Sequence, residues 1–162
     1  RVPHCLITGW CLCGRLDREV SVEGLTQDGV RAYLRANGVS SAKVVEEIIS
    51  GFDFDRPVYE QRLEPRHELW QFVRNASHSE LAPRTGNWFS LSGATLTGLS
   101  IFGGGSGRQM HRFIVEHEFI AIEGSARAMP RNWGWSGGGE GGHTQIYVPP
   151  RLIGHLRSVG PQ

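Results

Sequence analysis

Three polar residues in the second half of the chain have side chains that suit the binding of a nucleotide. Arg84 lies just before an expected strand, where its guanidinium could hold a diphosphate through two parallel hydrogen bonds. Gln145 starts another expected strand after a glycine-rich loop, where its amide could hydrogen-bond ribose hydroxyls and orient water. His111 opens a third, and its imidazole either packs at a sheet edge or takes part in ligand binding or catalysis. Taken singly, Arg84 is also typical of a solvated surface, and Gln145 of a polar strand cap.

Two tryptophans lie beside the glycine-rich segment 134–142 that precedes Gln145. Exposed faces of Trp133 and Trp135 would suit stacking on nicotinamide or adenine, and the alternative is ordinary packing of this loop on the core. Neither this segment nor the glycine-rich segment 102–107 has the Lys-Ser or Lys-Thr of a phosphate-binding loop, or opens a helix after a strand. The sequence therefore disfavours a nucleoside triphosphatase or a Rossmann enzyme.

The overall composition is that of a folded protein with almost no net charge. The 162 residues include 17 basic and 16 acidic side chains, a formal net charge of +1, which argues against a nucleic-acid groove that neutralises phosphates. No apolar stretch approaches the length of about 18 residues that crosses a bilayer. We therefore expect no nucleic-acid partner and no membrane span, with any signal or delivery module cut away or lying upstream.

The cysteines crowd near the start of the chain. Cys5, Cys11 and Cys13 leave three alternatives open: a zinc site with His4 as fourth ligand, one local disulfide with a spare thiol, or three free thiols. The zinc alternative has no recognised finger spacing, so we expect no metal at the functional site.

The first half of the chain carries helical patterns. Thr26 is a good N-cap for a helix over 24–37, and a second helix is expected over 41–49. Because Pro65 should break or begin a helix, we place a third helix after it, within 60–75.

From Gly86 onward, β-branched and aromatic runs alternate with glycine clusters. Strands are expected over 88–91, 111–117, 118–122 and 144–148, with a short helix after Pro150. The predicted fold class is α+β, a helical N-terminal half followed by a β-rich half. We divide the chain into a mainly helical lobe, 1–80, and a core, 81–162, which together form one compact domain.

Over about residues 81–159 these segments resemble the tuberculosis necrotizing toxin family of NAD⁺ glycohydrolases. That family runs from an Arg-x-Gly turn and a Phe-containing strand, through a His-x-Tyr-x-Val strand, to a Trp-Phe-Gly turn and a Gly-Gly-Gly-Thr-Gln-Tyr strand. The similar segments of this chain are Arg84-Thr85-Gly86 with Trp88-Phe89, His111-Arg112-Phe113-Ile114-Val115, Trp133-Gly134-Trp135, and Gly142-His143-Thr144-Gln145-Ile146-Tyr147.

The resemblance implies a role for each matching residue. Arg84 and His111 would grip NAD⁺, and Gln145 would be the catalytic polar residue. The aromatic side chains implied at the bound NAD⁺ are Trp88 or Phe89 as its wall, with Phe113, Trp133 and Trp135. The resemblance also implies a small, strongly curved sheet related to the ADP-ribosyltransferase fold.

Three departures from the family pattern weaken the residue assignments. Phe113 replaces the family tyrosine, Ile146 intervenes before Tyr147, and the loop before Gln145 is about two residues longer. The match at Arg84 is the weakest, and Arg62 is its rival because transferases carry their NAD-gripping arginine on an early strand.

The expected reaction is hydrolysis of NAD⁺, and of NADP⁺, to nicotinamide and the ADP-ribose product. The nicotinamide departs neutral, so the reaction needs little acid or base help and no cofactor beyond its substrates. In the transferase relatives a glutamate commonly occupies the place of Gln145, and an amide there favours water as acceptor. Such a toxin would be secreted or delivered into a target cell, depleting its NAD⁺, and a bacterial producer would hold it with an immunity protein.

Three other functions stay open. A mono-ADP-ribosyltransferase would modify a macromolecule with the same substrate, and a binding module would read nucleotides without turnover. A metal-independent nuclease would pair His111 with His143 or His117 as acid and base, although RNA-cutting domains usually carry a marked basic excess.

Overall fold

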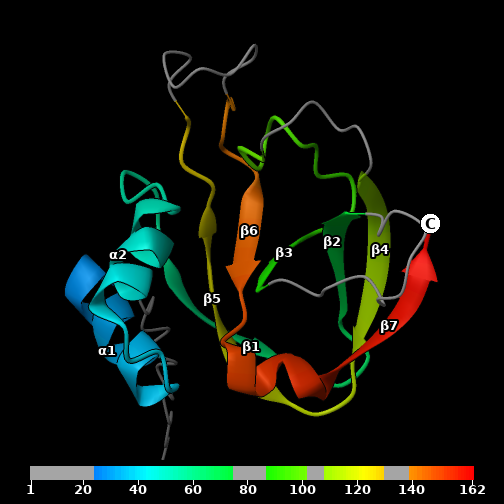
Figure 1. Ribbon diagram of the computed structural model, residues 1–162, viewed down its shortest axis with the longest axis horizontal. Coiled ribbons are helices and arrows are strands. Elements are labelled where there is room, and N and C mark those ends of the chain that lie inside the picture. The colour runs from blue at the N-terminus through cyan, green and yellow to red at the C-terminus, as the bar shows by residue number, and fades with distance from the viewer. Residues whose placement is uncertain (1–23, 75–86, 102–107, 130–138) are drawn as a thin grey trace, which may run out of the picture.

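The computed structural model describes residues 24–74, 87–101, 108–129 and 139–162 of the chain. Within these ranges, seven strands form one antiparallel sheet in the spatial order β1-β5-β6-β3-β2-β4-β7 (Figure 1). Two pairs of neighbours in this order, β1 with β5 and β6 with β3, are far apart in sequence. The strands are β1 (Tyr59–Leu63), β2 (Glu68–Arg74), β3 (Trp88–Ser90), β4 (Arg108–Val115), β5 (Phe119–Ser125), β6 (Thr144–Tyr147) and β7 (Leu156–Pro161).

Two short helices precede the sheet and pack beside β5 and β6 (Figure 1). In α1 (Gln27–Ala36), the Thr26 hydroxyl accepts a hydrogen bond from the Gly29 N–H at 3.2 Å, as expected of an N-cap. In α2 (Ala42–Ser50), Ser41 caps the Val44 N–H in the same way at 3.4 Å. The two helices predicted at these places are therefore confirmed.

The apolar faces of both helices share one hydrophobic cluster with the outer side of β5 and β6. Tyr33 ties the two parts together, because its hydroxyl donates to the Ile120 carbonyl at 2.6 Å. Burial raises the pKa of Tyr33, so this phenol stays protonated and keeps donating. The buried members of the cluster are Val30, Tyr33, Leu34, Val39, Val45, Ile48, Ile49, Phe52, Val58, Ile122 and Tyr147.

A second hydrophobic cluster fills the space between the two halves of the sheet. Ala121 and Ile146, on β5 and β6, contribute their inward faces, and Leu69 and Phe113, on β2 and β4, contribute from the other half. Side chains of the 3-10 helix η1 (Pro150–His155) pack against this cluster. The two halves of the sheet therefore face each other across a shared core.

The two halves meet at the short strand β3. Its three residues pair with β6 at three positions, whereas a single pair, Trp70 with Ser90, joins it to β2. Alternation along β3 sends Phe89 into the second cluster and leaves Trp88 and Ser90 on the helix side. This junction is where the cavity described below lies.

The predicted fold class is wrong. The described chain is mostly an antiparallel seven-stranded sheet with only short helices, rather than a helical half followed by a small sheet. The error lies in 59–74, where β1 and β2 replace the helix expected after Pro65. Along β2, Leu69, Gln71 and Val73 are buried with a period of two, and the buried polar Gln71 disguised that alternation.

Other elements in the second half follow the prediction, with shifted ends. The four expected strands correspond to β3, β4, β5 and β6, and the helix expected after Pro150 is η1. The edge strand β7, which pairs with β4, was not predicted, because Gly160 and Pro161 are poor strand formers. Over the described ranges, no helix is both long and apolar enough to cross a membrane, and no three potential metal ligands gather.

Phe89→Ala should lower the free energy of unfolding by about 3–5 kcal/mol. The Phe89 side chain is 2% exposed and packs edge-on against Phe113 at 5.2 Å between ring centroids, so truncation leaves a cavity between the halves. Urea unfolding would measure the change. The control is Leu91→Ala, two residues away and 45% exposed, which should change stability by less than about 0.5 kcal/mol. Equal losses in both variants would contradict the placement of β3.

Candidate functional site

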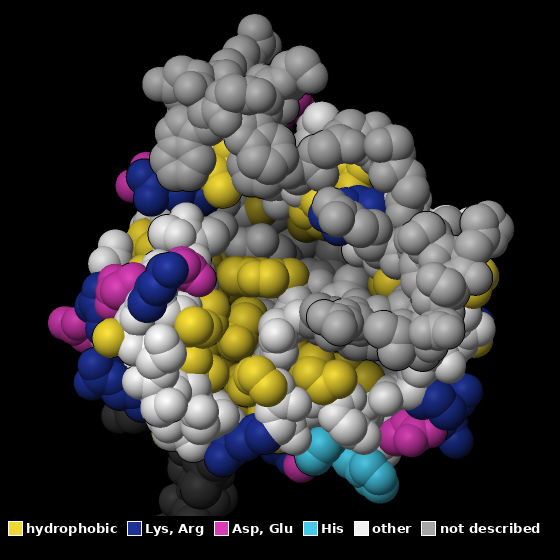
Figure 2. Space-filling view, viewed as in Figure 1, with side chains coloured by type: hydrophobic (Ala, Val, Ile, Leu, Met, Phe, Trp, Pro, Cys, Tyr) yellow, Lys and Arg dark blue, Asp and Glu magenta, His cyan; other side chains and the backbone are white. Residues whose placement is uncertain are grey.

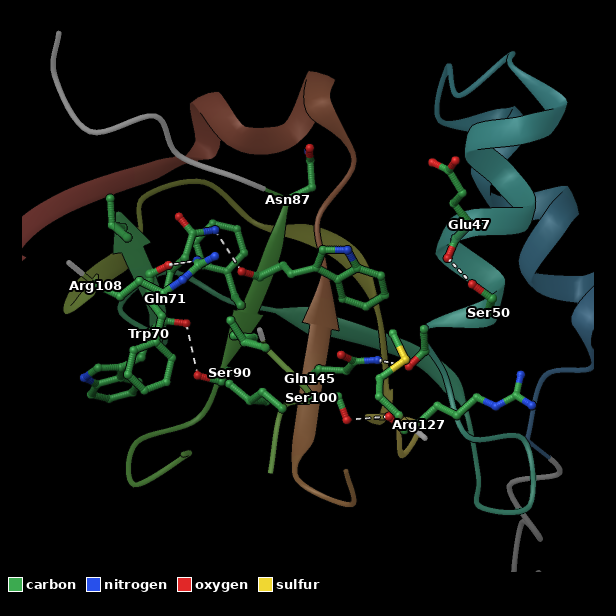
Figure 3. A pocket seen from close by; sticks show the side chains of 18 residues that line it. Glu47, Ser50, Trp70, Gln71, Asn87, Ser90, Ser100, Arg108, Arg127 and Gln145 are labelled. Atoms are coloured by element: carbon green, nitrogen blue, oxygen red, sulfur yellow. Dashed lines mark hydrogen bonds between the residues drawn. The ribbon is translucent and has the colours of Figure 1, made fainter. Parts of the chain in front are cut away.

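A cavity of about 590 Å³ opens on the helix side of β3 and β6 (Figure 3). This volume is within the range of small-molecule pockets, roughly 300–1,000 Å³. Its walls come from the end of α2, strands β2 and β3, and the segments 99–101 and 127–129, with Gln145 from β6. Figure 2 shows hydrophobic side chains gathered near the centre of this face and charged ones mostly toward its rim. The cavity therefore combines an apolar lining with a few polar groups.

Gln145 is the buried amide of this cavity. It lies on β6 opposite Ser90 of β3, and its side chain is 7% exposed. Its Nε2 donates to the Gly51 carbonyl at the end of α2, at 2.6 Å. The Arg127 backbone N–H donates to the same carbonyl oxygen at 2.9 Å. The amide is thus fixed by a backbone group from the opposite wall.

Trp88 forms an aromatic wall of the cavity. Its ring centroid lies 5.1 Å from those of Phe52 and Tyr147, in tilted and edge-on arrangements. Gly51 packs directly on the indole, because a Cβ at that position would lie 3.1 Å from Trp88 Cζ2. Burial raises the pKa of the Tyr147 phenol, so the support behind Trp88 carries no charge.

Two arginines and one glutamate bring charge to the cavity lining. Arg108, at the start of β4, extends toward Gln71 in Figure 3, with Nη1 3.5 Å from the Phe72 carbonyl. Arg127 extends outward, away from Gln145, and Glu47 stands on α2. Within the described residues, neither arginine forms an ion pair with a carboxylate.

His111 lies near the cavity but does not line it. It is 6% exposed on β4, directly opposite Gln71 of β2. Gln71 does line the cavity, and its Nε2 donates to the Trp88 carbonyl at 2.8 Å. Phe113, two residues beyond His111, is in the second hydrophobic cluster, whereas Phe89 belongs to that cluster and also contributes to the lining.

The remaining sequence-predicted residues are either outside the described ranges or on another part of the sheet. Arg84, Trp133 and Trp135 are outside the described residues. Arg62, the rival to Arg84, is on β1 and forms an ion pair with Glu118 at 2.6 Å, and it does not line the cavity. Of the candidate site residues, the structure brings Gln145, Trp88 and Phe89 together.

The histidines considered as an acid and base pair lie on separate elements. His143 Nδ1 accepts the Thr95 N–H at 3.2 Å, and the His117 ring packs against His155 with 5.8 Å between centroids. Among the described residues, no hydrogen bond or ring contact joins either of them to His111.

Sequence reasoning missed Arg108, Gln71 and Gly51. Gln71 was assigned to a helix, and recognising β2 by its period of two would have placed it beside the later strands. Nothing in the sequence points to Gly51, because a contact with a residue 94 positions away leaves no local signal. Arg108 follows the glycine-rich segment 102–107, and nothing in its neighbourhood distinguishes it from a surface arginine.

One family model matches the chain, and Tse6 and Rhs1-CT are two of the solved structures to which it is similar. The family model of bacterial toxin 46 matches residues 5–112, more than half of the chain. The fold is similar to Tse6, solved in complex with Tsi6, with a TM-score of 0.61, 20% identity, and coverage of 82% of this chain and 92% of that chain. Rhs1-CT, solved with its cognate immunity protein RhsI1, gives a TM-score of 0.47, 18% identity, and coverage of 69% and 82%. No curated protein matches the sequence.

Proposed function

The chain belongs to the bacterial toxin 46 family, and from this membership and its cavity we propose that it hydrolyses NAD⁺ and NADP⁺ to nicotinamide and the corresponding ADP-ribose product. The observation that carries the proposal is the buried amide of Gln145 in a largely apolar cavity beside Trp88. The resemblance of the second half of the chain to NAD⁺ glycohydrolases supports the same reaction. The fold that the chain shares with Tse6 is compatible with it.

The chemistry of the reaction suits a cavity with few titratable groups. The bond between the nicotinamide nitrogen and the ribose breaks with its electron pair going to nitrogen, so the leaving group becomes neutral. Positive charge then develops on the ribose, and a fixed amide oxygen is a partial negative charge that stabilises it. Water adds to the anomeric carbon and loses a proton to solvent. Gln145 would serve as that dipole and would hydrogen-bond a ribose hydroxyl.

Trp88 and Arg108 fit the two ends of the substrate. The face of an indole attracts a cationic ring, so Trp88 would hold the nicotinamide before cleavage and lose that attraction as the charge leaves the ring. Arg108 lacks a carboxylate partner within the described chain and would bind the diphosphate. The proposal also keeps Arg84 and His111 as residues that bind NAD⁺.

We propose further that the toxin is delivered into a target cell and is held by an immunity protein in its producer. An enzyme that consumes a shared cofactor would otherwise harm the cell that makes it. The complex of the similarly folded Tse6 with Tsi6 supports a dedicated protein partner.

Gln145→Ala should reduce the rate of nicotinamide release from NAD⁺ by about 10²–10³-fold, as loss of a fixed transition-state dipole does elsewhere. Chromatography of the products would measure free nicotinamide and ADP-ribose. The matched control is Gln61→Ala, on a half-buried strand position that does not line the cavity, which should retain wild-type turnover. A wild-type protein that releases no nicotinamide would refute the proposal, and adenylate label found on a macromolecule would favour the transferase.

Arg108→Ala should raise KM for NAD⁺ by about tenfold or more and change kcat less, because a charge-assisted contact to the diphosphate holds substrate and transition state alike. Steady-state kinetics would separate the two constants. Arg35→Ala, at an exposed position on α1, provides the control. An unchanged KM in the Arg108 variant would assign the diphosphate to another arginine, such as Arg84.

A further inference from the structure

We infer that Gly51 is a positioning residue for Gln145, and that its carbonyl makes position 145 suitable for an amide and unsuitable for a carboxylate. The inference rests on the proposed function of the cavity and specifies how the amide is presented there. Its basis is the 2.6 Å hydrogen bond from Gln145 Nε2 to the Gly51 carbonyl.

The orientation of the amide follows from the partner. A backbone carbonyl can only accept hydrogen bonds, so the amide must turn its nitrogen toward Gly51. The Gly51 oxygen also accepts the Arg127 N–H at 2.9 Å, so two donors converge on it. Gly51 is the C-cap of α2, where unpaired carbonyls give the helix end a partial negative charge. That charge favours an N–H donor and opposes an anion.

The oxygen of the same amide is left for a ligand. Among the described residues, no donor contacts Gln145 Oε1, and the one fully buried side-chain N or O atom without a partner is Nε of Arg112. Because Gln145 lines the cavity and Gly51 takes its Nε2, Oε1 is the polar atom of this side chain that a ligand in the cavity can reach. Gly51 thus determines that an acceptor, and not a donor, faces the substrate.

The absence of a side chain at Gly51 lets the Trp88 indole pack directly against this residue. Its backbone angles, φ −75° and ψ −21°, are accessible to any residue, so glycine is not required for conformation. An added Cβ would lie 3.1 Å and 3.2 Å from two ring atoms of Trp88, and 3.3 Å from the Ile48 carbonyl. Either the indole or the Gly51 carbonyl would have to shift by a few tenths of an ångström. The amide and the aromatic wall therefore depend on one backbone position.

A carboxyl at position 145 would meet an acceptor where the amide provides a donor. Ionised, it would place an anionic oxygen against the Gly51 carbonyl, and only the protonated form could donate as Nε2 does. Burial and the carbonyl both raise the pKa of such a carboxyl.

The charged side chains that line the same cavity are Glu47, Arg108 and Arg127. The residues opposite position 145 on β3 and β5 are the uncharged Ser90 and Gly124. His143, just before β6, is bound through Nδ1 to the Thr95 N–H.

The first test measures stability and does not depend on catalysis. Urea unfolding of Gln145→Glu and wild type is followed between pH 4 and pH 8, and the stability difference is taken at each pH. Because the folded-state pKa of the introduced carboxyl is raised, the deficit of the variant should be full above that pKa and should shrink as the pH falls through it. Gln61→Glu, at a β1 site remote from the cavity, should show no such recovery on acidification. A Gln145→Glu deficit that stays constant or grows at low pH would overturn the inference.

The second test uses turnover. The activity of Gln145→Glu should rise on acidification, by about tenfold for each pH unit between pH 8 and the raised pKa, relative to wild type at the same pH. Gly51→Ala should reduce kcat by about tenfold or more with a smaller change in KM, because it displaces the dipole that acts in the transition state. Gly154→Ala, where an added Cβ meets nothing within 4 Å, is the matched control and should match wild type.

The two tests separate the inference from the proposed function. If wild type releases no nicotinamide, the proposed function fails, and the pH dependence of stability still decides whether Gly51 selects the amide. If wild type is active but Gly51→Ala matches Gly154→Ala in kcat, Gly51 does not position Gln145.

Discussion

The backbone of Gly51 connects the end of α2 to the sheet and to one wall of the cavity. Its carbonyl ends α2 and accepts hydrogen bonds from β6 through Gln145 and from the segment after β5 through Arg127. Its Cα lies against the Trp88 indole of β3. Two strands of the sheet and the segment after β5 are thereby held to the end of one helix, and the cavity lies beside this attachment. Apolar packing gives most of the stability, but these contacts fix where the polar group stands.

The sheet supplies a second constraint, because the cavity requires its two halves to separate on the helix side. The junction at β3 allows this, since one pair joins it to β2 while three join it to β6. On the opposite side, the cluster that contains Phe89 and Ile146 closes the gap with apolar contacts. The cavity with its buried amide and the dry core thus lie on opposite faces of the same three-residue strand.

The sequence predicted those parts of this arrangement that leave local signals. Thr26 and the 3.6-residue spacing of apolar side chains placed α1, and β-branched runs placed β4, β5 and β6. Gln145 was singled out as an uncharged amide at the start of a strand after a glycine-rich loop, and it does line the cavity. Local signals failed where long-range pairing decides the structure. The segment around Pro65 is equally compatible with a helix start and with the turn between β1 and β2. The pairing of β1 with β5 and of β2 with β4 joins residues far apart in sequence, so it leaves no local signal.

The late position of β6 in the chain also determines when the site can form during synthesis. Gln145 lies on β6, which must insert between β5 and β3 before the cavity has its buried amide. Both neighbours precede β6 in the chain, so a ribosome that has not passed Tyr147 carries a polypeptide in which the sheet is divided into unjoined pieces. Such nonlocal closure folds slowly compared with helical domains. The nascent chain is consequently without the proposed site until nearly all of these elements have been made, so a cell that produces it would have an interval before the proposed activity exists.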